Sequence, residues 1–144
     1  GSPQEGFDRV FSDGELHDFL GPLDYLVSVL PDTASTTGLL NSESLGCLPK
    51  GACFINVGRS NVIDDDALLN ALTSGQLAGA VLDVFDQEPL PTTSPLWDAP
   101  NLAITAHVAA ISYPQLLVPI FVNNYERYVN GEPLKFPIDL SLGY

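Results

Sequence analysis

The sequence predicts an α/β fold built on a parallel sheet of about four strands. Four short apolar runs typical of buried strands, residues 25–30, 52–57, 78–85 and 102–105, alternate with segments of helical periodicity. Such alternation is characteristic of doubly wound sheets. No two of the 12 glycines are separated by a single residue, so the Gly-x-Gly-x-x-Gly phosphate cradle is absent. We therefore expect a partial, Rossmann-like sheet that lacks the first βαβ unit.

The helix candidates lie between and after these strands. Asp64 is expected to cap the clearest one, because acidic residues follow it at the positive end of the helix dipole, and Gly75 is expected to end it. Pro119 interrupts the last candidate and should either kink that helix or mark its true start. The candidates cover residues 13–20, 41–48, the segment between Asp64 and Gly75, and residues 113–130.

Composition limits the possible partners. The formal net charge of −13 argues against nucleic acid and against an anionic membrane surface. No apolar run approaches the roughly 20 residues of a membrane span, and no signal peptide is recognisable at the N-terminus. Cys47 and Cys53 have neither the spacing of a redox pair nor that of a zinc site. We expect Cys53 to pack in a buried strand, no metal to be bound, and the compartment to be the reducing cytoplasm.

Three side chains able to act together follow three different strand candidates. Arg59, Glu88 and His107 each come after an apolar run. Because the carboxyl ends of parallel strands lie side by side, these residues are expected to border one crevice. An arginine can hold a carboxylate bidentately, a histidine can transfer a proton, and a glutamate next to the histidine favours its protonated form. Together they suit the reduction of a keto acid, whereas each residue alone would more often be structural or solvated.

From about Asp24 onward the chain resembles the D-isomer-specific 2-hydroxyacid dehydrogenases. The resemblance rests on several segments that occur in the family's order and spacing. They are Leu30-Pro31 with Thr36-Thr37-Gly38-Leu39, Asn56-Val57-Gly58-Arg59-Ser60, LDVFDQEPL at 82–90 and ITAH at 104–107. The sequences QEPLP at 87–91, SPLW at 94–97 and the terminal Gly143-Tyr144 are similar to the glyoxylate and hydroxypyruvate reductase branch.

The resemblance implies a role for each matching residue. Arg59 would bind the substrate carboxylate and keto oxygen, Glu88 would be the acidic partner, and His107 would transfer the proton. The implied cofactor is NAD or NADP, and the implied substrate is a small 2-keto or 2-hydroxy acid. The positions matching those that line the cofactor are Leu30, Pro31, Asn56, Val57, Gly58, Arg59, Asp83, His107 and Ala110.

The resemblance also implies how the chain is organised. Residues 1–2 look like the remnant of a cleaved tag, and residues 3–112 match the second half of an NAD(P)-binding domain. Residues 113–144 match a helix and tail that would return to a substrate domain. Because the glycine cradle is missing, we expect the 144-residue chain alone to be inactive. The family implies a homodimer.

Two features leave alternatives open. Family members commonly have proline before the histidine, and Ala106 stands there, so the histidine backbone is expected to be less rigid. The same three residues also occur in corepressors that resemble these enzymes. A cofactor-sensing binding scaffold without physiological turnover is therefore the alternative to an enzyme. Asp83, between Leu82 and Val84, must find a hydrogen-bonding partner if it is buried.

Overall fold

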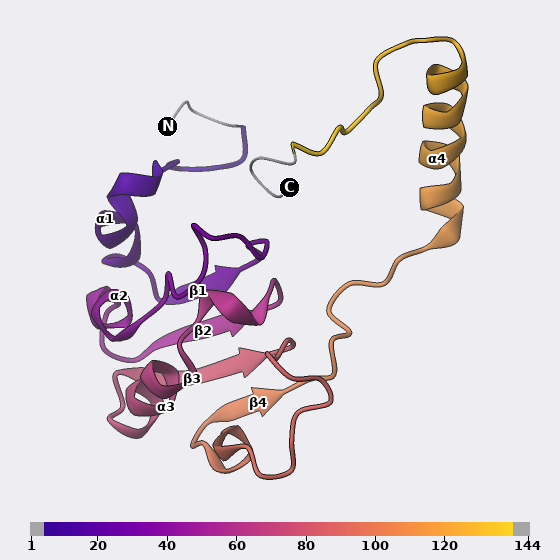
Figure 1. The fold of residues 1–144 in the computed structure, drawn as a ribbon. Coiled ribbons are helices and arrows are strands. Elements are labelled where there is room, and N and C mark those ends of the chain that lie inside the picture. The colour runs from indigo at the N-terminus through magenta and orange to yellow at the C-terminus, as the bar shows by residue number, and fades with distance from the viewer. Residues whose placement is uncertain (1–4, 140–144) are drawn as a thin grey trace.

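The structure is a computed structural model that describes residues 5–139, and its centre is a four-stranded parallel sheet (Figure 1). The strands are β1 (Tyr25–Ser28), β2 (Ala52–Asn56), β3 (Leu77–Leu82) and β4 (Leu102–Ile104), and they lie side by side in the order β1-β2-β3-β4. The predicted α/β fold and the number of strands are confirmed. Residues 1–2 and Gly143-Tyr144, which carried two of the sequence-based expectations, lie outside the described residues.

Helices connect the strands and cover one face of the sheet (Figure 1). The covering helices are α1 (Leu16–Leu20), α2 (Ser42–Cys47) and α3 (Asp65–Thr73), and three short 3-10 turns occur at η1 (Asp13–Glu15), η2 (Ser60–Val62) and η3 (Pro95–Asp98). The Asp64 side chain caps α3 by accepting the backbone N–H of Ala67, as predicted. Gly75 ends this helix with a φ of 72°.

The hydrophobic core lies between this face and the three helices. Alternate strand residues point into it, among them Leu26, Phe54, Ala80 and Leu82. They meet leucines from the helices, such as Leu45 and Leu68, which are almost fully buried. The core therefore fixes which face of each strand is inward.

The opposite face of the sheet has no helix over it within residues 5–139. We call it the open sheet face and define it by Tyr25, Val27, Cys53, Ile55, Val81 and Ala103. Pairing across β2, β3 and β4 aligns Ile55 with Val81 and Val81 with Ala103, so these side chains share one surface. Cys53 was expected to be buried but is partly exposed there, because the face it lies on has no covering layer.

The last helix, α4 (Pro114–Val129), stands away from the sheet at the end of an extended connection (Figure 1). None of its residues is buried. It begins at Pro114, so the interpretation of Pro119 as the start of the helix is wrong: Pro119 lies inside the helix. Within residues 5–139, no helix has the length and apolar character that crossing a membrane requires.

Candidate active site

The strand ends that precede Arg59, Glu88 and His107 are aligned with one another. Asn56 at the end of β2 pairs with Leu82 at the end of β3, and Leu82 pairs with Ile104 at the end of β4. Arg59 and His107 lie three residues beyond their strands. All three segments therefore leave the same carboxyl edge of the sheet, as the sequence predicted.

His107 and Glu88 are in direct contact at this edge. The Nδ1 atom of His107 lies 2.9 Å from Oε2 and 3.2 Å from Oε1 of Glu88. The Phe85 backbone N–H donates to Oε1 at 3.0 Å and fixes the carboxylate from the other side. The hydrogen bond from His107 and then that from Phe85 lower the pKa of Glu88. A carboxylate that stays ionised in this way directs the Nδ1 proton of the imidazole and leaves Nε2 for a ligand.

The backbone of His107 has a positive φ of 54°, a left-handed conformation that costs a non-glycine residue roughly 1–2 kcal/mol. Asp83 holds the chain in this conformation. Its backbone carbonyl accepts the His107 N–H at 2.8 Å, and its carboxylate accepts the N–H groups of Val108 at 3.0 Å and Ala109 at 2.9 Å. This tether constrains the histidine without the proline that the family usually has before it.

The Asp83 carboxylate is buried, with 2% of the residue exposed. Burial by itself would raise the pKa of Asp83. The hydrogen bonds from the Thr105 hydroxyl and from the two backbone N–H groups outweigh burial, so the pKa lies below its usual value. Asp83 has thus found the partners that the sequence required of it. Thr105 was not singled out from the sequence; the signal for it was a hydroxyl on the strand beside a buried acid.

Asn56 holds the loop that carries Arg59. Its side chain is fully buried, its Nδ2 donates to the Arg59 carbonyl at 2.9 Å, and its Oδ1 accepts the Gly58 N–H at 3.1 Å. The Arg59 guanidinium donates to the Gly58 carbonyl at 2.8 Å. In the described part of the chain it forms no ion pair. The structure therefore places Arg59 at the same edge as Glu88 and His107 without a direct contact, and its charge is available to a ligand.

Gly58 brings the ends of β1 and β2 together. A Cβ at this position would lie 2.7 Å from both the N and the O atom of Leu30, so only glycine permits the approach. Leu30 and Pro31 are thereby held next to Val57 and Gly58. These four residues form the apolar part of the edge, which fits the flat ring of a nicotinamide. Ala110 is exposed just beyond the Asp83 tether.

The positions expected to line a cofactor thus fall into two groups. Leu30, Pro31, Val57 and Ala110 lie at the edge, together with Arg59 and His107. The side chains of Asn56 and Asp83 are instead turned inward and hold the loops. Within residues 5–139, no group of three or more His, Cys, Asp or Glu side chains is placed to hold a metal ion.

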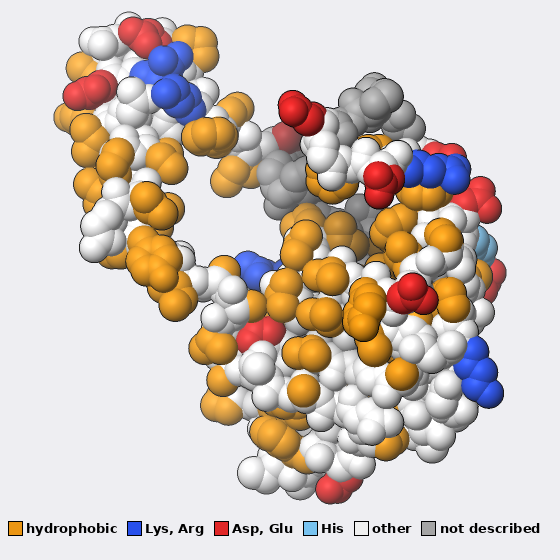
Figure 2. Space-filling view, turned by 180° about the vertical axis from the view of Figure 1, so that it is seen from behind, with side chains coloured by type: hydrophobic (Ala, Val, Ile, Leu, Met, Phe, Trp, Pro, Cys, Tyr) orange, Lys and Arg blue, Asp and Glu red, His pale blue; other side chains and the backbone are white. Residues whose placement is uncertain are grey.

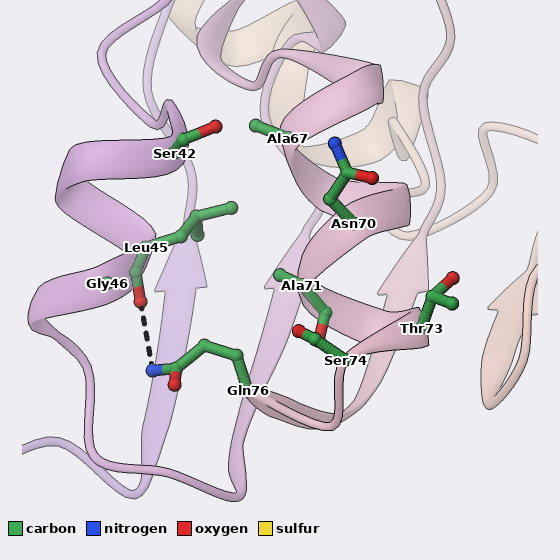
Figure 3. A pocket seen from close by; sticks show the side chains of 9 residues that line it. All are labelled: Ser42, Leu45, Gly46, Ala67, Asn70, Ala71, Thr73, Ser74 and Gln76. Carbon is green, nitrogen blue, oxygen red and sulfur yellow. Dashed lines mark hydrogen bonds between the residues drawn. The ribbon is translucent and has the colours of Figure 1, made fainter.

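The largest hollow of the molecule lies elsewhere, between α2 and α3 (Figure 3). It has a volume of about 430 Å³, and Gln76 closes one end by donating to the carbonyls of Leu45 at 3.3 Å and Leu48 at 2.8 Å. None of its lining residues is titratable. Size alone therefore does not identify the reactive site, and the strand-end edge remains the candidate because it carries the charged side chains. The lining residues are Ser42, Leu45, Gly46, Ala67, Asn70, Ala71, Thr73, Ser74 and Gln76.

A parallel sheet with an arginine and a histidine–glutamate pair at its carboxyl edge defines a dehydrogenase-type nucleotide-binding domain. The model of the D-isomer specific 2-hydroxyacid dehydrogenase, NAD binding domain, matches residues 2–109. The chain therefore belongs to the D-isomer specific 2-hydroxyacid dehydrogenase family.

Individual relatives agree with this assignment. Glyoxylate/hydroxypyruvate reductase A of Salmonella newport is 44% identical over 130 residues, which are 90% of this chain and 42% of that protein. A D-isomer specific 2-hydroxyacid dehydrogenase of Xanthobacter autotrophicus, solved with NADPH, is 46% identical with a TM-score of 0.87, over 91% of this chain and 54% of that one. The NADPH-dependent glyoxylate/hydroxypyruvate reductase of Sinorhizobium meliloti, solved with NADP, is 37% identical with a TM-score of 0.87, over 93% and 44%. This chain thus spans less than half the length of the curated relative.

Proposed function

We propose that this chain is the catalytic half of the nucleotide-binding domain of an NAD(P)H-dependent reductase. The substrate is a small 2-keto acid such as glyoxylate or hydroxypyruvate, and the product is the D-2-hydroxy acid. The observation that carries the proposal is the 2.9 Å contact between His107 Nδ1 and Glu88 Oε2 at the strand edge that also carries Arg59.

Arg59 binds and orients the substrate. Its planar guanidinium can pair with a carboxylate through two parallel hydrogen bonds, which fixes the face of the neighbouring carbonyl. Asn56 supports this role because it holds the backbone of the Arg59 loop at two points. The absence of an ion pair to Arg59 within the described residues is consistent with a side chain that pairs with substrate.

His107 supplies the proton. Nδ1 donates to Glu88, so the proton delivered to the keto oxygen comes from Nε2 of the imidazolium. A bound reduced nicotinamide supplies the hydride to C2, and together the hydride and the proton convert the carbonyl to a secondary alcohol. The neutral imidazole left behind keeps its hydrogen bond to the Glu88 carboxylate and recovers a proton from solvent, because the side chain is 49% exposed.

Residues 3–112 are proposed to be the second half of the cofactor domain, and the segment 113–144 to be a helix and tail that contact a substrate domain. The sequence has no glycine cradle to offer backbone N–H groups to a pyrophosphate. We therefore propose that the 144-residue chain has no turnover by itself. The free thiols of Cys47 and Cys53 suit the cytoplasm, and the working form is proposed to be a homodimer.

The test compares two proteins in an assay for oxidation of NADPH and NADH with glyoxylate and hydroxypyruvate. One is the 144-residue chain, and the other is a protein in which a relative's N-terminal segment precedes it. The longer protein should turn over, and His107→Gln within it should lower kcat by roughly 10²–10⁴-fold, the usual contribution of a general acid. The short chain should show no turnover.

His17→Gln is the matched control, because His17 is an exposed histidine remote from the strand edge, and it should leave kcat unchanged. Turnover by the short chain would contradict the proposed division of labour. A folded, cofactor-binding longer protein without turnover on any 2-keto acid would contradict the reductase and favour the cofactor-sensing scaffold.

A further inference from the structure

Two apolar surfaces of this chain lie uncovered, and the first is the open sheet face. Val27 is 54% exposed although it lies within a strand of a parallel sheet. Parallel sheets are normally covered on both faces, because their strands are apolar on both sides. Seen from behind, the body of the molecule shows hydrophobic side chains gathered across its surface (Figure 2). The residues that define this face carry no charge.

The second surface is α4. Residues 114–125 contain no charged side chain, and the first part of the helix is apolar on all sides, with Gln115 as its polar exception before Asn123. A helix that is apolar all round requires burial on more than one side. Phe121 is nevertheless 71% exposed. The residues concerned are Leu116, Leu117, Val118, Ile120, Phe121 and Val122.

The far end of α4 is closed off by the chain itself. Asn124 exchanges two hydrogen bonds with the backbone of Lys135, at 3.0 and 2.8 Å, and Arg127 pairs with Glu132 at 3.3 Å. The following segment thus folds against the last turns of the helix. The apolar N-terminal half is left for a partner.

The connection to β4 keeps α4 off its own sheet. Asp83 accepts hydrogen bonds from residues 107, 108 and 109, so the direction of the chain is fixed as far as Ala109. The remaining four residues before α4 span at most roughly 14 Å. A helix over β2 of the same chain would lie about 10 Å across the sheet and about 10 Å above it. The connection would be fully extended with nothing left for the reversal of direction.

We propose that two copies of this chain form a reciprocal dimer in which α4 of each copy packs on the open sheet face of the other. The partner's face is reached without breaking the Asp83 tether. Both surfaces are uncharged, so the charge of −13 is not concentrated at the interface. In a symmetric pair, the all-round apolar half of α4 can bury one side on the sheet and another against the remainder of the partner, which folding back onto its own sheet would not provide. The inference does not depend on the proposed reductase activity.

The first experiment measures oligomeric state by light scattering over a range of concentrations of the 144-residue chain. We expect the mass of two chains for the unaltered protein. Val27→Asp on the sheet face and Phe121→Asp on α4 should each weaken dimerisation by at least about 100-fold, because each charge is buried twice in the symmetric pair. Phe7→Asp is the matched control: Phe7 is equally exposed but outside both surfaces, and the dimer should persist.

Mixing the two interface variants makes the test specific. A heterodimer of the Val27→Asp and Phe121→Asp chains keeps one intact helix–sheet contact, so mixing should restore dimers that neither variant forms alone. A monomeric unaltered chain, or a dimer insensitive to both variants, would overturn the proposal.

The second experiment uses Cys53, which lies on the open sheet face. With Cys47→Ser to remove the other thiol, a cysteine introduced as Leu117→Cys should form an intermolecular disulfide with Cys53 under mild oxidation, giving a covalent dimer on a non-reducing gel. A disulfide confined to one chain would show that α4 folds back onto its own sheet and would overturn the exchange. Absence of any Cys53–117 disulfide, as pairing through the edge of β1 would give, would overturn it too.

Discussion

The carboxylate of Asp83 accepts the backbone N–H of Ala109 at 2.9 Å, across 26 positions of the chain. With the bonds from Val108 and Thr105, this contact ties the end of β3 to the segment that carries His107. The proposed proton donor is therefore positioned by a buried residue that does not touch it through its side chain. The Arg59 loop has the same arrangement, with Asn56 as the buried residue.

Replacing Asp83 by asparagine should destabilise the fold. An amide nitrogen would face the N–H of Ala109, leaving a buried donor without an acceptor at a cost of roughly 1–3 kcal/mol. Urea unfolding monitored by circular dichroism measures this loss. Asp86→Asn, an exposed control on the same loop, should change the free energy of unfolding by less than about 0.5 kcal/mol. Equal effects of the two substitutions would refute the tether.

The stability of the fold should fall in acid because the pKa values of Asp83 and Glu88 are both lowered. A carboxyl group whose pKa is lower in the folded than in the unfolded state stabilises the fold at neutral pH. That contribution is lost below about pH 5, as the unfolded chain and then the folded chain take up protons. Urea midpoints measured as a function of pH should decline over this window, and less steeply in Asp83→Asn. A flat profile would contradict the shifts.

The Glu88 carboxylate offers a more local readout. Carbon-detected NMR titration should place its midpoint below the ordinary value for glutamate, because it accepts from His107 and from Phe85. In His107→Gln the first of these contributions changes, and the midpoint should move toward the ordinary value. Glu126, exposed on α4, is the internal reference in the same spectra. A Glu88 midpoint that is unaffected by the substitution would mean that the pair does not form in solution.

Gly58 and Gly46 should respond to alanine in opposite directions. At Gly58 the new methyl group would lie 2.7 Å from the Leu30 backbone, and relieving this overlap should cost roughly 1–3 kcal/mol. At Gly46, inside α2, a Cβ meets nothing within 4 Å, and alanine should stabilise the helix by about 0.5–1 kcal/mol. Thermal or urea unfolding distinguishes the two. Stabilisation by Gly58→Ala would show that β1 and β2 do not approach as described.

Asn56→Ala should loosen the Arg59 loop. The substitution leaves the N–H of Gly58 and the carbonyl of Arg59 without their buried partner, so the fold should lose roughly 1–3 kcal/mol for each group that water cannot reach. Hydrogen exchange should rise at Gly58 while the amides in the middle of α3 stay protected. Asn61→Ala is the control, because Asn61 bonds an exposed hydroxyl on the same loop. Unchanged exchange at Gly58 would remove Asn56 from the site.

Much of the site was predictable because it depends on topology. Arg59, Glu88 and His107 follow three apolar runs, and parallel strands bring such positions to one edge. The roles of Asn56 and Asp83 were not predictable in the same way. A polar residue at the end of a strand can face a ligand or turn inward, and the choice depends on which backbone groups lie within 3 Å after folding.

The amino-acid sequence by itself determined the parallel sheet, the capped helix after Asp64 and the three reactive side chains at one edge, because apolar periodicity and capping are local properties of a chain. Only the tertiary structure decided that one sheet face is open, that Cys53 is partly exposed and that α4 stands apart from the core. An apolar pattern reports that a surface favours burial; what buries it depends on segments distant in the chain, or on another molecule.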